Sequence, residues 1–175
     1  MQKAITVMLD DLATNFSALL TEMGIPYDAR TQSIFDAKLV GVFTKPPGEL
    51  TETAVRVFTD VTARDDGICF LRWLKARGFT IVLCVNRDIR LCYELTVNWL
   101  AQNAVPYDYL FTATAPAGLC MDMDIPLFVY NLPEGGYDDI QLVTFTGQGE
   151  QRQPEILGDF GNFEEVKQCV IKMGF

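Results

Sequence analysis

The sequence predicts an α/β fold, built on a doubly wound, mostly parallel sheet with helices on both faces. Short apolar segments alternate along the chain with longer segments of helical periodicity, most clearly from residue 67 onward. The apolar segments are rich in β-branched residues and lack polar alternation, which is typical of strands covered on both sides. Strands that alternate with helices favour a parallel sheet with right-handed crossovers.

The expected strands are short apolar runs bounded by polar or turn-forming residues: 4–9, 79–85, 109–111, 125–130 and 140–146. The expected helices carry apolar residues three or four positions apart: 11–23, 67–77, 89–103, 116–122 and 162–173. Two glycines and a proline predict a loop over 147–154. A small helical cap is expected as an insertion at about 17–65, with helices near 34–40 and 50–60. The core of this single domain then comprises about 1–16 and 66–175.

The composition fits one globular domain and excludes several classes of chemistry. The chain has 175 residues, 49% of them hydrophobic, and a formal net charge of -9. This acidic balance makes direct nucleic-acid binding unexpected, because phosphate backbones are bound by clustered Lys and Arg. The absence of His excludes a Ser–His–Asp triad. The five cysteines include no C-x-x-C pair and are expected to be reduced.

The apolar segments are too short for other cellular destinations. The N-terminal run is shorter than the apolar region of a signal peptide, and no run reaches the length of a membrane span. A cytoplasmic protein without membrane contact is therefore expected.

Four of the predicted strands end in segments at which a parallel sheet binds its ligands, and one of these segments is 112–114, after the strand at 109–111. Asp10 and Asp11 follow the first strand, Asn86 and Arg87 the second, and Asn131 comes after Tyr130 at the end of another. These positions are the first candidates for a functional site.

Several motifs appear in an order known from one superfamily. They are "VMLDDLATNF" at 7–16, "ARGF" at 76–79, "VNRD" at 85–88, "VPYDYLF" at 105–111 and "YNLPEG" at 130–135. This order resembles the haloacid dehalogenase-like superfamily, in particular its small 5'-nucleotidase-like members with a short helical cap. The resemblance covers about residues 4–145. It implies a Rossmann-like core and a phosphatase site at the carboxyl ends of the strands.

The first motif of that superfamily is D-x-D-x-T after a hydrophobic strand, and it admits two alignments. In the first, which keeps Phe16 and the following helix in register, Asp10 is the acid–base and Met8 occupies the place of the nucleophile. In the second, Asp10 is the nucleophile and Thr14 the motif threonine, but Leu12 replaces the second Asp. Either alignment lacks one essential carboxylate, and a thioether cannot serve as nucleophile and magnesium ligand.

The other three motifs of the superfamily are also altered. Val85 stands where a hydroxyl residue is expected, although Asn86 and Arg87 remain. No Lys or Arg occurs from Leu91 through Gln151 to serve as the third-motif cation. Tyr130 and Asn131 occupy the place of the acidic pair that would hold Mg²⁺.

The resemblance therefore implies a catalytically degenerate member, leaning away from enzymatic activity. Its altered pocket would comprise Met8, Asp10, Asp11, Val85, Asn86, Arg87, Tyr130 and Asn131. Such a protein would bind a partner protein or a small anionic ligand, with no cofactor and no metal expected. One alternative is a divergent Mg²⁺-dependent nucleotidase in which Asp10 and Asp11 are catalytic and Asp10 contacts the metal. Another is an acidic inhibitor or nucleic-acid mimic, which only the charge favours.

Overall fold

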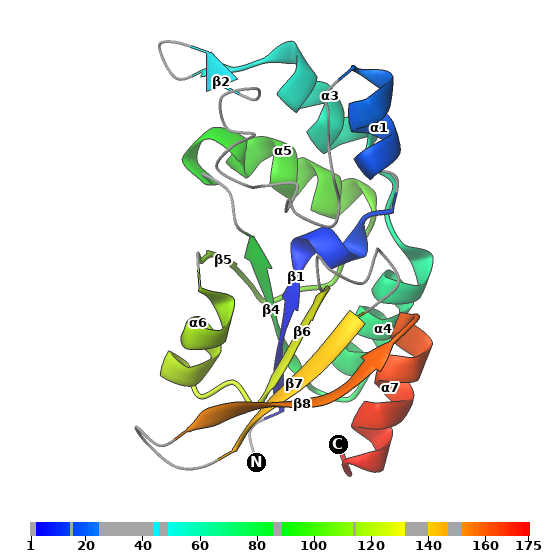
Figure 1. Ribbon diagram of the computed structural model, residues 1–175, viewed down its shortest axis with the longest axis vertical. Helices are drawn as coiled ribbons and strands as arrows, with labels where there is room; N and C mark the ends of the chain where they lie inside the picture. Colours follow the sequence, from blue (N-terminus) through cyan, green and yellow to red (C-terminus); the bar gives the residue numbers. More distant parts are fainter. Residues whose placement is uncertain are drawn as a thin grey trace.

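The computed structural model describes residues 3–14, 16–24, 44–45, 49–85, 89–113, 115–131, 140–146 and 152–175. These residues form an α/β fold around a six-stranded sheet with the order β5-β4-β1-β6-β7-β8 (Figure 1). The strands of this sheet are β1 (Ala4–Met8), β4 (Thr80–Val85), β5 (Tyr109–Thr112), β6 (Leu127–Asn131), β7 (Ile140–Thr146) and β8 (Gln153–Phe160).

The sheet is mixed. β1 pairs in parallel with both β4 and β6, and β4 pairs in parallel with β5. β7 pairs antiparallel to β6, and β8 antiparallel to β7. The predicted α/β class is confirmed, and the parallel part follows the predicted strands. The antiparallel end of the sheet was not predicted.

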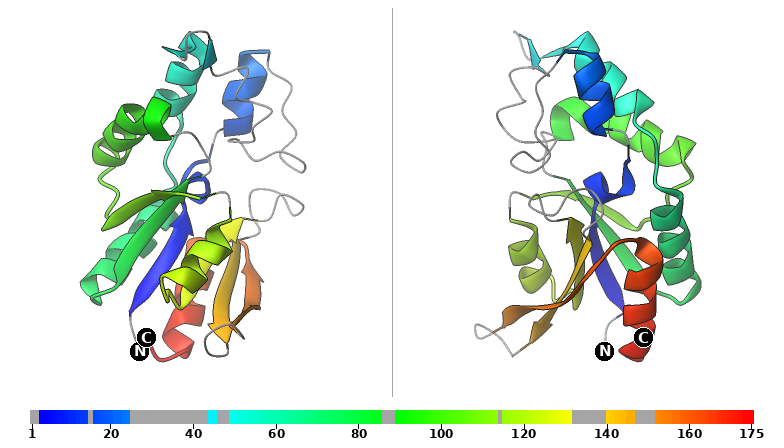
Figure 2. Two further views of the ribbon diagram at one scale, coloured as in Figure 1. Left: turned by 90° about the vertical axis from the view of Figure 1, so that its left-hand side faces the viewer. Right: turned by 45° about the vertical axis from the view of Figure 1, so that its right-hand side comes forward.

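Helices lie against both faces of the sheet, which explains why its strands read as continuous apolar runs. The helices of the described residues are α1 (Phe16–Glu22), α3 (Glu52–Asp60), α4 (Asp65–Ala76), α5 (Ile89–Gln102), α6 (Pro116–Asp122) and α7 (Phe163–Lys172). Of these, α4, α6 and α7 contact strands of the large sheet. Figure 2 shows α6 on one side of the sheet and α4 with α7 on the other.

Alternate residues of β1, β4, β6 and β7 belong to two separate cores. Ile5 and Val7 of β1 join the cluster that contains Leu71 of α4 and Val166 of α7. Ala4 of β1 joins the smaller cluster around Cys120 of α6. Because side chains alternate between the faces of a strand, each of these four strands contributes to both cores. We call the α4–α7 side face 1 and the α6 side face 2.

The segment predicted as one helix over 11–23 is divided into two. A 3₁₀ helix, η1 (Leu9–Leu12), follows β1 directly, and α1 begins only at Phe16. Between them Ala13 forms an antiparallel bridge with Ala63. The prediction was wrong here because the Thr14 amide and the Leu12 carbonyl form hydrogen bonds with residues 62–64. In a continuous helix these groups would bond within the helix.

β8 was missed, since residues 147–154 were predicted as a loop and no strand was expected after them. β8 contains Pro154 and Gly158, which are unfavourable in strands, and most of it is exposed. Pro is tolerated at the edge of a sheet, where a missing N–H costs no ladder bond. Pairing with the buried β7 therefore outweighs the weak local preference of β8.

Within the region predicted as a cap, the described residues contain α1, α3 and a short antiparallel pair, β2 (Thr44–Lys45) with β3 (Glu49–Leu50). The helix expected at 50–60 is confirmed as α3, whereas the one expected near 34–40 lies outside the described residues. α3 packs against α1 and α5 beyond the carboxyl end of the parallel strands (Figure 1).

Candidate functional site

The carboxyl ends of β1, β4, β5 and β6 lie at one edge of the sheet, because these strands run parallel. Met8 is opposite Cys84, and Val7 is opposite both Leu83 and Val129. Met8 and Val85, the last residues of β1 and β4, lie at this edge, as do Tyr130 and Asn131 at the end of β6. The polar residues predicted after the strands, Asn86 and Arg87, lie outside the described residues.

Asp10 and Asp11 belong to η1 at the same edge. The side chain of Asp11 is only 5% exposed, and it has an interaction partner within the protein. Burying a carboxylate without a partner would be costly, so this buried position requires such support. The side chain of Asp10 is outside the described set.

The segment that enters α4 holds η1 in place. The amide of Arg64 donates to the carbonyl of Leu12 at 2.8 Å, and the amide of Thr14 donates to the carbonyl of Thr62 at 2.9 Å. On its other side, this segment accepts a 2.8 Å hydrogen bond from the Trp99 indole to the Val61 carbonyl. The residues that carry Asp10 and Asp11 are therefore linked to α5 through residues 61–64.

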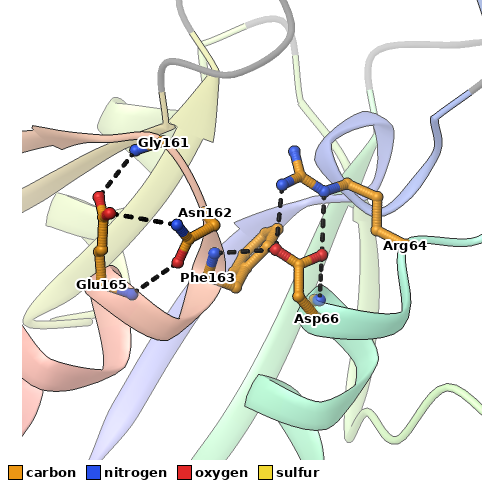
Figure 3. A network of polar contacts seen from close by, with 7 residues as sticks. Arg64, Asp66, Gly161, Asn162, Phe163 and Glu165 are labelled. Carbon is orange, nitrogen blue, oxygen red and sulfur yellow. Dashed lines mark hydrogen bonds and ion pairs between the residues drawn. The ribbon is translucent and has the colours of Figure 1, made fainter.

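The carboxylate of Asp66 joins this segment to α4 and α7 (Figure 3). One oxygen accepts from Arg64 Nε at 3.1 Å and from the Gly67 amide at 2.9 Å. The other accepts from Arg64 Nη2 and from the Phe163 amide, both at 3.0 Å. Burial by itself would raise the pKa of Asp66, but these hydrogen bonds and the guanidinium charge hold that pKa below its usual value.

A capping box starts α7 beside this carboxylate, as Figure 3 also shows. Asn162 accepts from the Glu165 amide at 3.0 Å, while Glu165 accepts from the Gly161 amide at 3.0 Å. The bonds to the Phe163 and Glu165 amides satisfy donors that the first turn of a helix leaves without partners, and the bond to the Gly161 amide holds the residue before the cap.

The two hydrophobic residues that end the central strands point to different faces. Val85 is fully buried in the core of face 1. Met8 is half-buried and packs on the core of face 2, together with Phe111 and Tyr130. The side chain of a buried valine has no group that donates a hydrogen bond to a ligand, so the Val85 side chain contributes only packing.

Gln141 and Asp159 are two polar residues at this edge that were not predicted as part of the site. The Tyr130 hydroxyl donates to Gln141 Oε1 at 2.5 Å, and Gln141 Nε2 donates to Asp159 Oδ1 at 2.6 Å. Burial, and then the charge of Asp159, raises the pKa of Tyr130, so the phenol stays neutral at ordinary pH. Gln141 was recognisable as the polar residue inside an apolar run, but Asp159 was not, because β8 itself was missed.

Two of the cysteines that the structure describes, Cys84 and Cys120, have a packing role. Cys84 and Cys120 are fully buried. Burial raises the pKa of the Cys120 thiol to about 11, against smaller opposing effects of the Thr6 hydroxyl and the Arg152 charge. A thiol with so high a pKa is a poor nucleophile.

Among the described residues, no three His, Cys, Asp or Glu side chains are grouped so that they could hold a metal ion. In the same part of the chain, no helix is long and apolar enough to cross a membrane.

Comparison with known proteins adds no relative: no protein-family model matches the chain, and a search of curated proteins finds no similar sequence.

Proposed function

We propose that this chain is a haloacid dehalogenase-like protein without phosphatase chemistry, which acts by binding a partner protein or a small ligand at the carboxyl edge of its parallel strands. The observation that carries the proposal is the pair Met8 and Val85. These hydrophobic residues end neighbouring central strands. In the alignment that keeps Phe16 in register, they correspond to the superfamily's nucleophile and its phosphate-binding hydroxyl.

Phosphoryl transfer depends on positioned charge, which supports this proposal. The reaction needs a nucleophile, a metal ion and a cation that stabilise the charge of the transferring group. Val85 lies inside the core, Met8 carries a thioether, and the phenol of Tyr130 is neutral. None of these three side chains supplies charge to a phosphoryl group.

The experiment is a phosphate-release assay in the presence of Mg²⁺. The substrates are a panel of nucleoside monophosphates and an aryl phosphate, and an active nucleotidase of the superfamily serves as the positive control. We expect no release above that of the Asp10→Asn variant. Turnover by the wild-type chain that disappears in a folded Asp10→Asn variant would refute the proposal.

A divergent Mg²⁺-dependent nucleotidase is the second candidate. It is favoured by the acidic pair Asp10 and Asp11 directly after β1, where Asp11 is buried rather than part of the solvated surface. In that case Asp10 would be a catalytic residue and a metal ligand, with Asp11 beside it. The same assay decides between the two functions, because only the second requires turnover that depends on Asp10.

A further inference from the structure

One residue from each strand of the large sheet lines up in a single row near the carboxyl edge. Phe111 is opposite Cys84, Cys84 is opposite Met8, and Tyr130 is opposite Gln141, which in turn is opposite Asp159. Met8 and Tyr130 are neighbours in the row, because Met8 follows Val7, Tyr130 follows Val129, and these two valines are paired. We call this set the edge row: Phe111, Cys84, Met8, Tyr130, Gln141 and Asp159.

The edge row is more open than the next row toward the amino ends of the strands. Phe111, Met8 and Tyr130 are all half-buried. The next row of face 2 is fully covered and consists of Val82, Thr6, Phe128 and Val143. The packing of α6 therefore seals the middle of face 2 and leaves the edge row partly accessible.

The accessible part of the edge row has the chemistry of a surface for an aromatic ring. Neighbouring strands are about 4.8 Å apart, so Met8 and Tyr130 together span roughly the width of one ring. Aromatic rings and a polarizable thioether both make favourable contacts with the face or edge of another ring. The Tyr130 ring is held by stacking on Phe128, at 5.0 Å between centroids and an interplanar angle of 13°.

Hydrogen bonds to Gln141 and Asp159 determine how the hydroxyl of Tyr130 is oriented. Its hydroxyl proton is directed at Gln141, and the amide of Gln141 is directed at Asp159. The phenol oxygen is thereby oriented as an acceptor, which suits a ligand with an N–H or O–H donor.

The charge of the row disfavours anions. None of its six residues is a cation, Asp159 carries a negative charge, and the chain has a net charge of -9. The edge row itself therefore supplies no positive group to bind an anion, and an uncharged ligand fits its six residues better.

We propose that Met8 and Tyr130 of the edge row bind an uncharged planar ring whose N–H or O–H group donates to the phenol oxygen of Tyr130. This inference rests on the proposed function, because it names the ligand class of the same edge. In this arrangement the thioether of Met8 contacts the face of the ligand ring, and the phenol oxygen of Tyr130 accepts a hydrogen bond from the group at its rim.

Methyl NMR on protein labelled at the methionine methyl groups tests this proposal. Met8→Leu assigns the Met8 signal among the six methionines. The probes are indole, benzofuran and inorganic phosphate, because indole and benzofuran have the same shape but only indole has an N–H. We expect saturable shifts of the Met8 signal with both rings, with indole binding about fivefold more tightly, as for one neutral hydrogen bond. Phosphate should leave the signal unchanged.

Two variants separate the named contact from general ring binding. Tyr130→Phe should abolish the preference for indole over benzofuran, whereas Tyr109→Phe, at the exposed start of β5, should preserve it. Met121 and Met123 are exposed near the end of α6, so equal shifts there would show non-specific partitioning and refute the proposal.

A Met8 signal that does not respond to either ring, or that responds only to phosphate, would also overturn the proposal. So would wild-type protein with equal affinity for the two rings. These outcomes leave the proposed function standing as long as the phosphate-release assay shows no turnover. Turnover dependent on Asp10 would instead refute the proposed function itself.

Discussion

The carboxylate of Asp66 accepts the backbone N–H of Phe163, 97 residues further along the chain, at 3.0 Å. The same carboxylate binds the guanidinium of Arg64, which also lies over the Phe163 ring with its central carbon 5.2 Å from the centroid. One side chain thus connects the start of α4, the start of α7 and the segment that holds η1. The position of the candidate site therefore depends on a junction on face 1 of the sheet.

The first prediction concerns this carboxylate. Asp66→Asn should lower the free energy of unfolding at neutral pH by about 1–2 kcal/mol, because it weakens hydrogen bonds to a charged acceptor. Asp65→Asn is the matched control, since Asp65 is the exposed neighbour in the same first turn of α4. Denaturant unfolding at pH 7 measures both. Equal losses in the two variants would contradict a special role for Asp66.

The pH dependence of stability gives a second prediction. The pKa of Asp66 is lower in the folded chain than its usual 3.8, so its stabilising effect is present above that value. The effect is lost as the pH falls through the folded pKa, below about 4. Wild type should lose stability more steeply than Asp66→Asn between about pH 4 and pH 2. Parallel pH profiles of the two proteins would show that this carboxylate does not contribute.

The third prediction concerns the close approach of η1 and α7 at Gly67. A Cβ there would lie 2.9 Å from Leu12 Cδ2 and 3.0 Å from Phe163 Cε2. Gly67→Ala should therefore destabilise the fold by about 1–3 kcal/mol, although alanine is the better helix former. Gly118→Ala in α6 is the control, because its nearest neighbour would be the Ala115 Cβ at 3.9 Å. That change should be neutral or slightly stabilising, and thermal unfolding distinguishes the two.

The indole of Trp99 leads to a fourth prediction. Trp99→Phe removes the hydrogen bond to Val61 and opens space at a site that is only 5% exposed, which should cost about 1–3 kcal/mol. Amide hydrogen exchange at Thr14 and Arg64 should accelerate, because both amides bond across the segment that Trp99 holds. Trp73→Phe on α4 serves as control. Unchanged exchange at Thr14 and Arg64 would show that residues 61–64 do not depend on Trp99.

Thiol labelling gives a fifth prediction. Iodoacetamide at pH 8 should modify Cys69, which is exposed, and leave Cys84 and Cys120 unmodified until the chain unfolds. For Cys120 both burial and a pKa of about 11 oppose the reaction. Peptide mapping by mass spectrometry identifies the labelled residues. Rapid labelling of Cys120 in the folded protein would contradict its place in the face 2 core.

Local sequence patterns were sufficient for most elements of the fold. The apolar runs that became β1, β4 and β7 and the periodic segments that became α4 to α7 lie within one or two residues of their predicted bounds. In these segments residue preference, hydrophobic period and final burial agree, and such agreement makes an element predictable. η1 and β8 failed this condition, because contacts with distant residues outweighed their local preferences.

For the candidate site, the sequence placed Met8, Val85 and Tyr130 at the ends of strands, and the parallel pairing brings them to one edge. It did not reveal that Val85 faces one core and Met8 the other, since this depends on where each strand begins. Gln141 and Asp159 joined the edge row only through the antiparallel pairing of β6, β7 and β8.

By itself, the sequence determined the class of the fold, most helices and strands of its core, and the hydrophobic residues Met8 and Val85 at the ends of two strands. These properties follow from residue identity and from the short-range periods of helix and strand. Only the tertiary structure decided which residues meet across the sheet and that Asp66 binds the amide of Phe163. The reason is physical: strand register and the docking of α7 arise from packing between segments far apart in the chain, which no local pattern encodes.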